Sequence, residues 1–81
     1  MDFKVIYFAS ARDAAGKREE RVSVDGAPTL EDLASKIRRL HPGLAGIQKS
    51  TRYAVNLEIV NGDTVLHDGD EVGVLPAVTG G

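Results

Sequence analysis

Residues 29–40 read Thr29-Leu30-Glu31-Asp32-Leu33-Ala34-Ser35-Lys36-Ile37-Arg38-Arg39-Leu40, and this stretch predicts one amphipathic helix. The hydroxyl of Thr29 can accept a hydrogen bond from the N–H of Asp32, whose carboxylate can bond back, which is a capping box. Pro42 disfavours helical geometry at the residue before it, so we expect the helix to end near Leu40. The apolar face of this helix, at helical spacing, consists of Leu30, Leu33, Ala34, Ile37 and Leu40.

Segments typical of β-strands stand on both sides of this helix. They are short, contain many β-branched and aromatic residues, and are separated by turn signals such as Asp25-Gly26 and Asn61-Gly62. We expect irregular connections at residues 10–17 and 43–51. The predicted strands are residues 2–8, 20–24, 52–57, 64–66 and 71–75.

The order of these elements restricts the fold. Two strands precede the helix and form a hairpin with a long loop, and the others follow it, so the helix should cover one face of a mixed sheet. The natural closure places the first and last strands side by side and parallel. This order predicts an α+β fold, the β-grasp or ubiquitin-like roll, over residues 1–76, followed by a flexible C-terminal Gly-Gly tail at residues 77–81.

The composition argues against several classes of protein. A chain of 81 residues forms one small domain with a thin core. The net charge of −2, with lysines and arginines scattered, argues against nucleic-acid binding. The absence of cysteine removes disulfides and thiolate chemistry. The longest apolar run, residues 5–9, is too short to span a bilayer, and the N-terminus lacks a signal-peptide pattern, so we expect a cytoplasmic protein without membrane contact.

Side chains that could form an independent active site are missing from the sequence. His41 and His67 stand in separate segments, and no third metal ligand follows at a recognisable spacing. The acidic run at residues 68–71 lacks the remaining ligands of a calcium loop and is typical of a turn. No phosphate-binding loop, nucleophile elbow or dinucleotide motif is present. We therefore expect no catalytic centre, bound cofactor or metal in this chain.

The C-terminus, Gly80-Gly81, is the remaining candidate for a reactive group. Two glycines place no side chain beside the terminal carboxylate, so a partner enzyme can close around it. A carboxylate is ionised at neutral pH and is a poor electrophile, so another protein must first activate Gly81, for example by adenylation. The five residues 77–81 can extend roughly 17 Å, far enough to enter the active site of a neighbouring protein.

Strand alternation predicts an apolar patch near the root of this tail. Phe8 and Leu75 should lie on neighbouring strands, on the face away from the helix, and exposed apolar patches often mark partner sites. The alternative is that Phe8 packs under a loop. Ile59 is a further candidate whose facing is left open by a nearby turn. The residues expected to face outward are Asp2, Lys4, Ile6 and Phe8 in the first strand and Glu71, Gly73 and Leu75 in the last.

The sequence resembles the MoaD-type family, the small sulfur-carrier subunits of molybdopterin synthase. The resemblance extends over the whole chain and is most specific at the end, where D-G-D-E-V is followed by P-x-V-T-G-G. Ala77 departs from the proline often found there, and Val74-Leu75 replaces a more aromatic pair. The matching segments are Lys4-Val5-Ile6-Tyr7-Phe8-Ala9 with Arg12, Pro28-Thr29, Ala54-Val55-Asn56 and Asp68 to Gly81.

This resemblance implies a mechanism for Gly81. An adenylating enzyme of the ubiquitin-activating type would use ATP to form an acyl-adenylate on Gly81, and a sulfur donor would convert it to a thiocarboxylate. The thiocarboxylate would then donate sulfur to cyclic pyranopterin monophosphate in the large subunit, which supplies the catalytic lysines. Val78, Thr79 and Gly80 would occupy the partner's channel, and two small and two large subunits would form a heterotetramer. The family's interface positions match Phe8, Ile59 and Leu75.

Two other functions stay open for a chain of this kind. One is a related sulfur carrier of the thiamin or tRNA-thiolating type, which shares the fold and the Gly-Gly end. The other is a ubiquitin-like protein modifier, which would form an isopeptide bond between Gly81 and a lysine. The ending Pro76-Ala77-Val78-Thr79-Gly80-Gly81 favours the molybdopterin synthase carrier over both.

Overall fold

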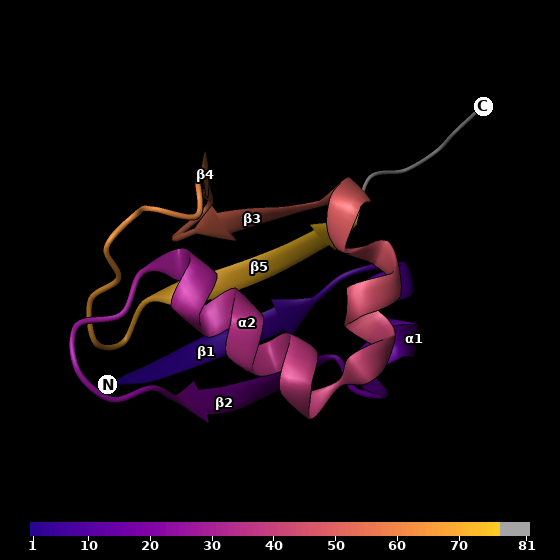
Figure 1. Ribbon diagram of the computed structural model, residues 1–81, viewed down its shortest axis with the longest axis horizontal. Helices are drawn as coiled ribbons and strands as arrows, with labels where there is room; N and C mark the ends of the chain where they lie inside the picture. The colour runs from indigo at the N-terminus through magenta and orange to yellow at the C-terminus, as the bar shows by residue number, and fades with distance from the viewer. Residues whose placement is uncertain (77–81) are drawn as a thin grey trace.

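Five strands form one mixed sheet in the computed structural model, which describes residues 1–76 (Figure 1). Their spatial order is β2-β1-β5-β3-β4. The strands are β1 (Asp2–Tyr7), β2 (Glu19–Ser23), β3 (Thr51–Val55), β4 (Glu58–Val60) and β5 (Glu71–Pro76). The helices are α1 (Ser10–Ala15), α2 (Leu30–Leu40) and the 3-10 helix η1 (Pro42–Ser50).

The first and last strands lie side by side at the centre of this sheet. β1 runs parallel to β5, with Val5 opposite Val72 and Tyr7 opposite Val74. β2 pairs with β1, and β3 with β5, both in antiparallel register. The predicted β-grasp topology is therefore confirmed, including the parallel contact between the two ends of the chain.

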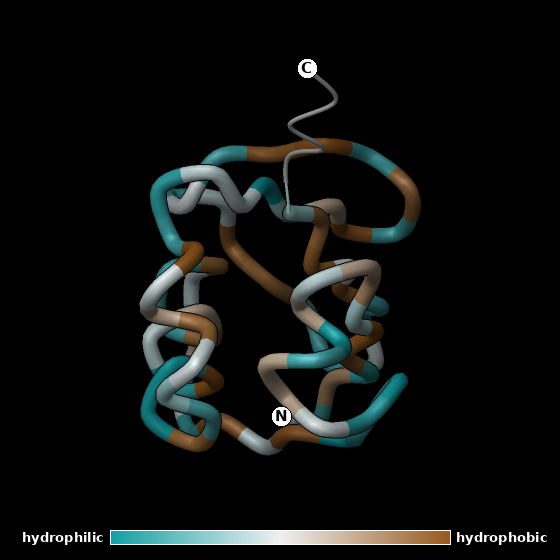
Figure 2. The backbone as a smooth tube through the Cα atoms, turned by 90° about the vertical axis from the view of Figure 1, so that its right-hand side faces the viewer, coloured by the Kyte–Doolittle hydropathy of each residue, from teal (hydrophilic) through white to brown (hydrophobic). Residues whose placement is uncertain are grey.

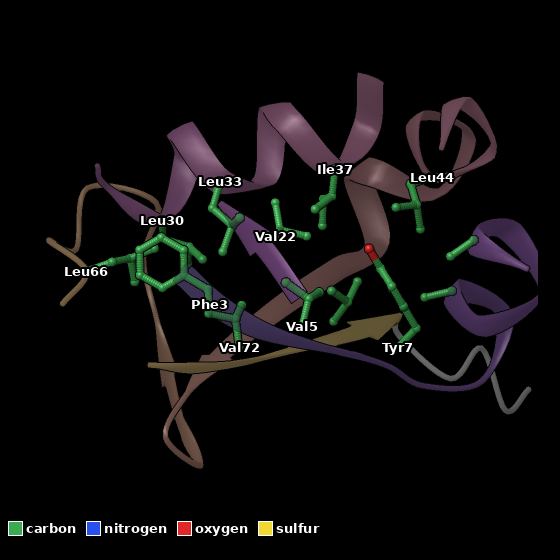
Figure 3. Close-up of a cluster of buried hydrophobic side chains, with 13 residues drawn as sticks. Phe3, Val5, Tyr7, Val22, Leu30, Leu33, Ile37, Leu44, Leu66 and Val72 are labelled. Carbon is green, nitrogen blue, oxygen red and sulfur yellow. The ribbon is translucent and has the colours of Figure 1, made fainter. Parts of the chain in front are cut away.

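α2 covers one face of the sheet, and the core fills the space between them (Figure 3). The predicted capping box is present: the Asp32 N–H donates to Thr29 Oγ1 at 3.3 Å, and the Thr29 N–H donates to Asp32 Oδ2 at 2.8 Å. Leu33 and Ile37 are fully buried above the sheet. Along the backbone, hydrophobic and hydrophilic residues are interspersed in the helices and strands (Figure 2). Local capping and burial of the apolar face together stabilise the helix predicted from residues 29–40.

Two helical segments replace the irregular connections that the sequence predicts. α1 begins after Ala9, whose φ is 49°, and no side chain caps it. It buries only Ala11 and Ala15, so neither a cap nor large apolar side chains mark it in the sequence. η1 starts at Pro42 and buries Leu44, and such short 3-10 turns have no strong periodic pattern.

The fourth strand also lies elsewhere than predicted. Residues 64–66 form no strand, and Val65 makes only an isolated bridge with Thr29. The fourth strand is β4, joined to β3 by the two-residue turn Asn56-Leu57, since Val55 pairs with Glu58. The sequence conceals this turn because leucine stands at a position where glycine is usual.

One carboxylate, Glu20, links β2 to the far end of α2. It lies opposite the buried Val5, and its Oε2 accepts a hydrogen bond from the Tyr7 hydroxyl at 2.6 Å. The same oxygen lies 2.5 Å from His41 Nε2, and Lys17 Nζ lies 3.5 Å from Oε1. Burial acts to raise the pKa of Glu20, but the hydrogen bonds from Tyr7 and His41 outweigh it and hold that pKa below its ordinary value.

Replacing Glu20 by glutamine is expected to flatten the loss of stability in acid. Because the pKa of Glu20 is lower in the folded protein than in the unfolded chain, the ionised form stabilises the fold above pH 4.5. This contribution is lost as the pH falls through the lowered pKa. We expect Glu20→Gln to reduce the free energy of unfolding by about 1 kcal/mol at neutral pH, with the difference shrinking in acid. Urea unfolding across a pH series measures this, and a difference that stays constant from neutral pH through the acid range contradicts it.

Candidate partner-binding site

The face of the sheet opposite α2 contains an apolar hollow of about 200 Å³. Its residues come from the two central strands and from the β3–β4 hairpin, which lie side by side in Figure 1. We call this feature the apolar hollow; it is lined by Ile6, Phe8, Ala54, Leu57, Ile59, Glu71, Gly73 and Leu75.

Strand register explains why these residues meet. Gly73 is opposite both Ile6 of β1 and Ala54 of β3, and Ala54 is opposite Ile59 of β4. Residues opposite one another in a sheet point to the same face, so these four side chains or positions all face away from α2. The register therefore settles the facing of Ile59, which the sequence alone leaves open.

A glycine at the floor of the hollow makes room for Phe8. A Cβ built at Gly73 would lie 3.3 Å from Cε2 of the Phe8 ring, so the ring lies directly over this position. Phe8 is 41% exposed and lines the hollow. The structure thus contradicts the alternative that Phe8 is covered by a loop.

The predicted site residues divide into two groups. Phe8, Ile59 and Leu75 come together in the apolar hollow. This confirms the predicted placement of Phe8 and Leu75 and decides that of Ile59, while their role in binding a partner stays a prediction. Val78, Thr79, Gly80 and Gly81 lie outside the described residues. Leu75 is the penultimate residue of β5, so the hollow adjoins the end of the last strand.

Leu57 is the residue of the hollow that sequence reasoning missed. It stands in the β3–β4 turn with φ of 73°, next to Asn56 with φ of 50°, as in a type I′ hairpin turn. Its side chain is 93% exposed, which makes it the most exposed large hydrophobic residue among those described. Asn56 was the available signal, because asparagine tolerates positive φ better than most residues.

The acidic run at residues 68–71 holds the hairpin and the start of β5 in place. Asp70 Oδ1 accepts a hydrogen bond from Asn56 Nδ2 at 2.9 Å, and Asn56 Oδ1 accepts from the Glu71 N–H at 3.0 Å. Asp70 Oδ2 accepts from the His67 N–H, and Asp68 Oδ1 accepts from the Asp2 N–H. These carboxylates satisfy backbone and amide donors, which agrees with the predicted turn.

The charges around the hollow are unevenly paired. Lys4 forms an ion pair with Glu19 at 3.3 Å on the neighbouring part of the sheet. None of the salt bridges within the described residues includes Glu71, which lines the hollow near the hairpin. This side of the hollow therefore has a negative rim.

The described residues contain neither a cluster of metal ligands nor a membrane-spanning helix. Within residues 1–76, no three His, Cys, Asp or Glu side chains are grouped so that they could hold a metal ion. No helix in the same range is both long enough and apolar enough to cross a membrane. His41 instead contacts Glu20 and packs edge-on against the ring of Tyr7 at 5.7 Å.

Comparisons with known proteins match this chain over its full length. The model of the ThiS family matches residues 5–81. A molybdopterin synthase sulfur carrier subunit from Chlamydomonas reinhardtii is 42% identical, and the match covers all of both chains. Among solved structures, SAMP1 from Haloferax volcanii has a TM-score of 0.90 at 27% identity, again over all of both chains. A complex of subunits 1 and 2 of molybdopterin-converting factor from Helicobacter pylori contains a chain with a TM-score of 0.72 at 26% identity, covering 100% of both.

Proposed function

The chain belongs to the ThiS family, and from this premise we propose that it is the sulfur carrier of molybdenum cofactor biosynthesis, the small subunit of molybdopterin synthase. The observation that carries the proposal is the 42% identity with such a subunit from Chlamydomonas reinhardtii over all of both chains. The Gly80-Gly81 end supplies the group on which the chemistry would take place.

The proposed reaction uses Gly81 as a carrier of one sulfur atom. An adenylating enzyme of the ubiquitin-activating type joins the Gly81 carboxylate to AMP from ATP and releases pyrophosphate. A sulfur donor then displaces AMP and leaves a C-terminal thiocarboxylate. This sulfur forms a bond to a carbon of the cyclic pyranopterin monophosphate and displaces an oxygen substituent there. Water then cleaves the resulting thioester, which leaves the sulfur on the pterin and returns Gly81 to a carboxylate. Each cycle thus consumes one ATP and regenerates the carrier, in the cytoplasm by this proposal.

The large subunit is the partner that the apolar hollow would receive. Docking there would bury Phe8, Ile59 and Leu75 together. Because each is already partly buried, each would contribute less than the gain of about 1.5–3 kcal/mol for a fully exposed side chain that leaves water. Val78, Thr79 and Gly80 would continue from β5 into the large subunit's channel. The large subunit would supply the catalytic lysines, and this chain would supply the sulfur. The Helicobacter pylori complex of subunits 1 and 2 supports a partner of this kind.

Thiocarboxylate formation tests the proposal directly. The purified chain is incubated with its adenylating enzyme, ATP and a sulfur donor, and its intact mass is measured. We expect the mass to rise by the difference between one sulfur and one oxygen atom, and only when ATP is present. A mass shift absent with every candidate activator contradicts the proposal. An isopeptide linkage between Gly81 and a lysine of another protein would instead support the modifier alternative.

A further inference from the structure

We propose that Leu57 is a specificity-determining anchor of the docking face, and that it enters an apolar recess bordered by basic groups on the large subunit. The inference rests on the proposed function, since it assigns a contact within the same interface. It rests in addition on the backbone conformation of Leu57.

The backbone at Leu57 is unfavourable for the residue that occupies it. With φ of 73°, Leu57 lies in the left-handed region, where a Cβ crowds the following carbonyl oxygen. The second position of such a two-residue turn ordinarily holds glycine. Leucine is therefore retained here at a cost to folding, and strain of this kind concentrates at functional sites.

Contacts of the Leu57 side chain within the chain do not offset this backbone strain. The Leu57 side chain is 93% exposed, compared with 54% for Ile59 and 41% for Phe8. It contributes almost nothing to the core, so folding gives no reason to prefer leucine over glycine at this position. A large apolar side chain exposed to this degree gains free energy only when a partner covers it.

The turn presents this side chain in a defined position. Asn56 donates to Asp70 Oδ1, accepts from the Glu71 N–H, and donates its own N–H to the Glu71 carbonyl at 2.8 Å. The turn that contains Leu57 is thus joined by three hydrogen bonds to Asp70 and to the first residue of β5. Because the backbone of this turn is already ordered, binding a partner does not have to order it, which favours an anchor residue here.

The position of Leu57 in the hollow and the charge near it indicate which partner would cover its side chain. Leu57 lines the same hollow as Phe8, Ile59 and Leu75, so a partner seated on those residues also reaches it. In the same hollow, Glu71 takes part in no salt bridge within residues 1–76. A matching partner surface therefore combines an apolar recess for the leucine with lysine or arginine side chains at its edge.

Two substitutions at Leu57 separate the effect of its side chain on binding from the effect of its backbone strain on stability. Leu57→Gly removes both, and Leu57→Ala removes the apolar side chain but keeps a Cβ at positive φ. We expect each variant to bind the large subunit about tenfold more weakly, which corresponds to about 1.4 kcal/mol. Leu57→Gly should also unfold at a higher temperature than wild type, and Leu57→Ala at about the same temperature. Isothermal titration with the purified large subunit and thermal unfolding provide the two readouts.

Leu40→Ala is the matched control, since Leu40 is an exposed leucine on α2, on the opposite face of the sheet. Its affinity for the large subunit should equal that of wild type. Unchanged affinity in both Leu57 variants overturns the inference, as does a lower unfolding temperature for Leu57→Gly. Phe8→Ala, measured in parallel, distinguishes the anchor role of Leu57 from the proposed interface as a whole. If Phe8→Ala weakens binding and the Leu57 variants do not, Leu57 is not an anchor, and the proposed interface is still supported.

Discussion

Deleting Gly81 is expected to abolish sulfur transfer and to leave the stability of the domain unchanged. The deletion moves the terminal carboxylate to Gly80 and shortens the chain by about 3.5 Å, so the carboxylate would no longer reach the reacting centre. Within residues 1–76 the buried core extends from Phe3 to Val74, so we expect folding not to depend on Gly81. Thiocarboxylate formation by intact mass and thermal unfolding are the two measurements.

A chain extended by one additional glycine provides the matched control for this deletion. This extended chain still ends in Gly-Gly, but its terminal carboxylate lies one residue farther from β5 than in wild type. We expect the extended chain to unfold like wild type and to transfer sulfur poorly. Transfer that persists without Gly81 would contradict the carrier role, and a large fall in unfolding temperature would show that the end of the chain supports the fold.

Replacing Leu75 by glutamate is expected to weaken binding to the large subunit about 100-fold, or by about 3 kcal/mol. The new carboxylate would lie in the apolar hollow and would be desolvated when the partner docks. Folding should change little, because Arg52 lies opposite Leu75 on β3 and an exposed ion pair costs and contributes little. Titration calorimetry and thermal unfolding separate the two effects.

Val65→Glu is the matched control for Leu75→Glu. Val65 is also an exposed apolar residue, but it lies beside the start of α2 and lines no part of the hollow. The same charge added there should leave affinity for the large subunit unchanged. Equal loss of affinity in the two variants would mean that net charge, and not the hollow, determines binding.

Local signals explain which elements were predictable. α2 has its cap, periodicity and terminating proline within one stretch, so residues 29–40 are sufficient to predict it. α1 was not predictable because it starts at Ala9 with positive φ and buries only alanines. Its position depends on packing against η1 and β5, which are distant in sequence. Tertiary contacts thus form a helix where intrinsic propensity gives no signal.

The part of the candidate site that was predictable is the part where the alternation of side chains along a strand alone determines which face a residue lies on. The facing of Phe8 and Leu75 follows from counting along β1 and β5, since neither strand is interrupted. Ile59 was not predictable, because its facing depends on where the β3–β4 turn lies. Leucine at position 57 is unusual in such a turn, so the sequence does not predict the turn there. The positive φ that makes Leu57 a candidate anchor is therefore also the reason why sequence reasoning missed it.

The central position of β5 has a kinetic consequence for the cell. This strand is the last to be synthesised, yet it lies between β1 and β3 and supplies Val72 and Val74 to the core. A nascent chain that lacks it cannot close the sheet, because the middle of the sheet is missing. The hollow needs the same strand, through Gly73 and Leu75. The docking face can therefore form only after β5 has been synthesised, and a chain that ends before Leu75 would lack it.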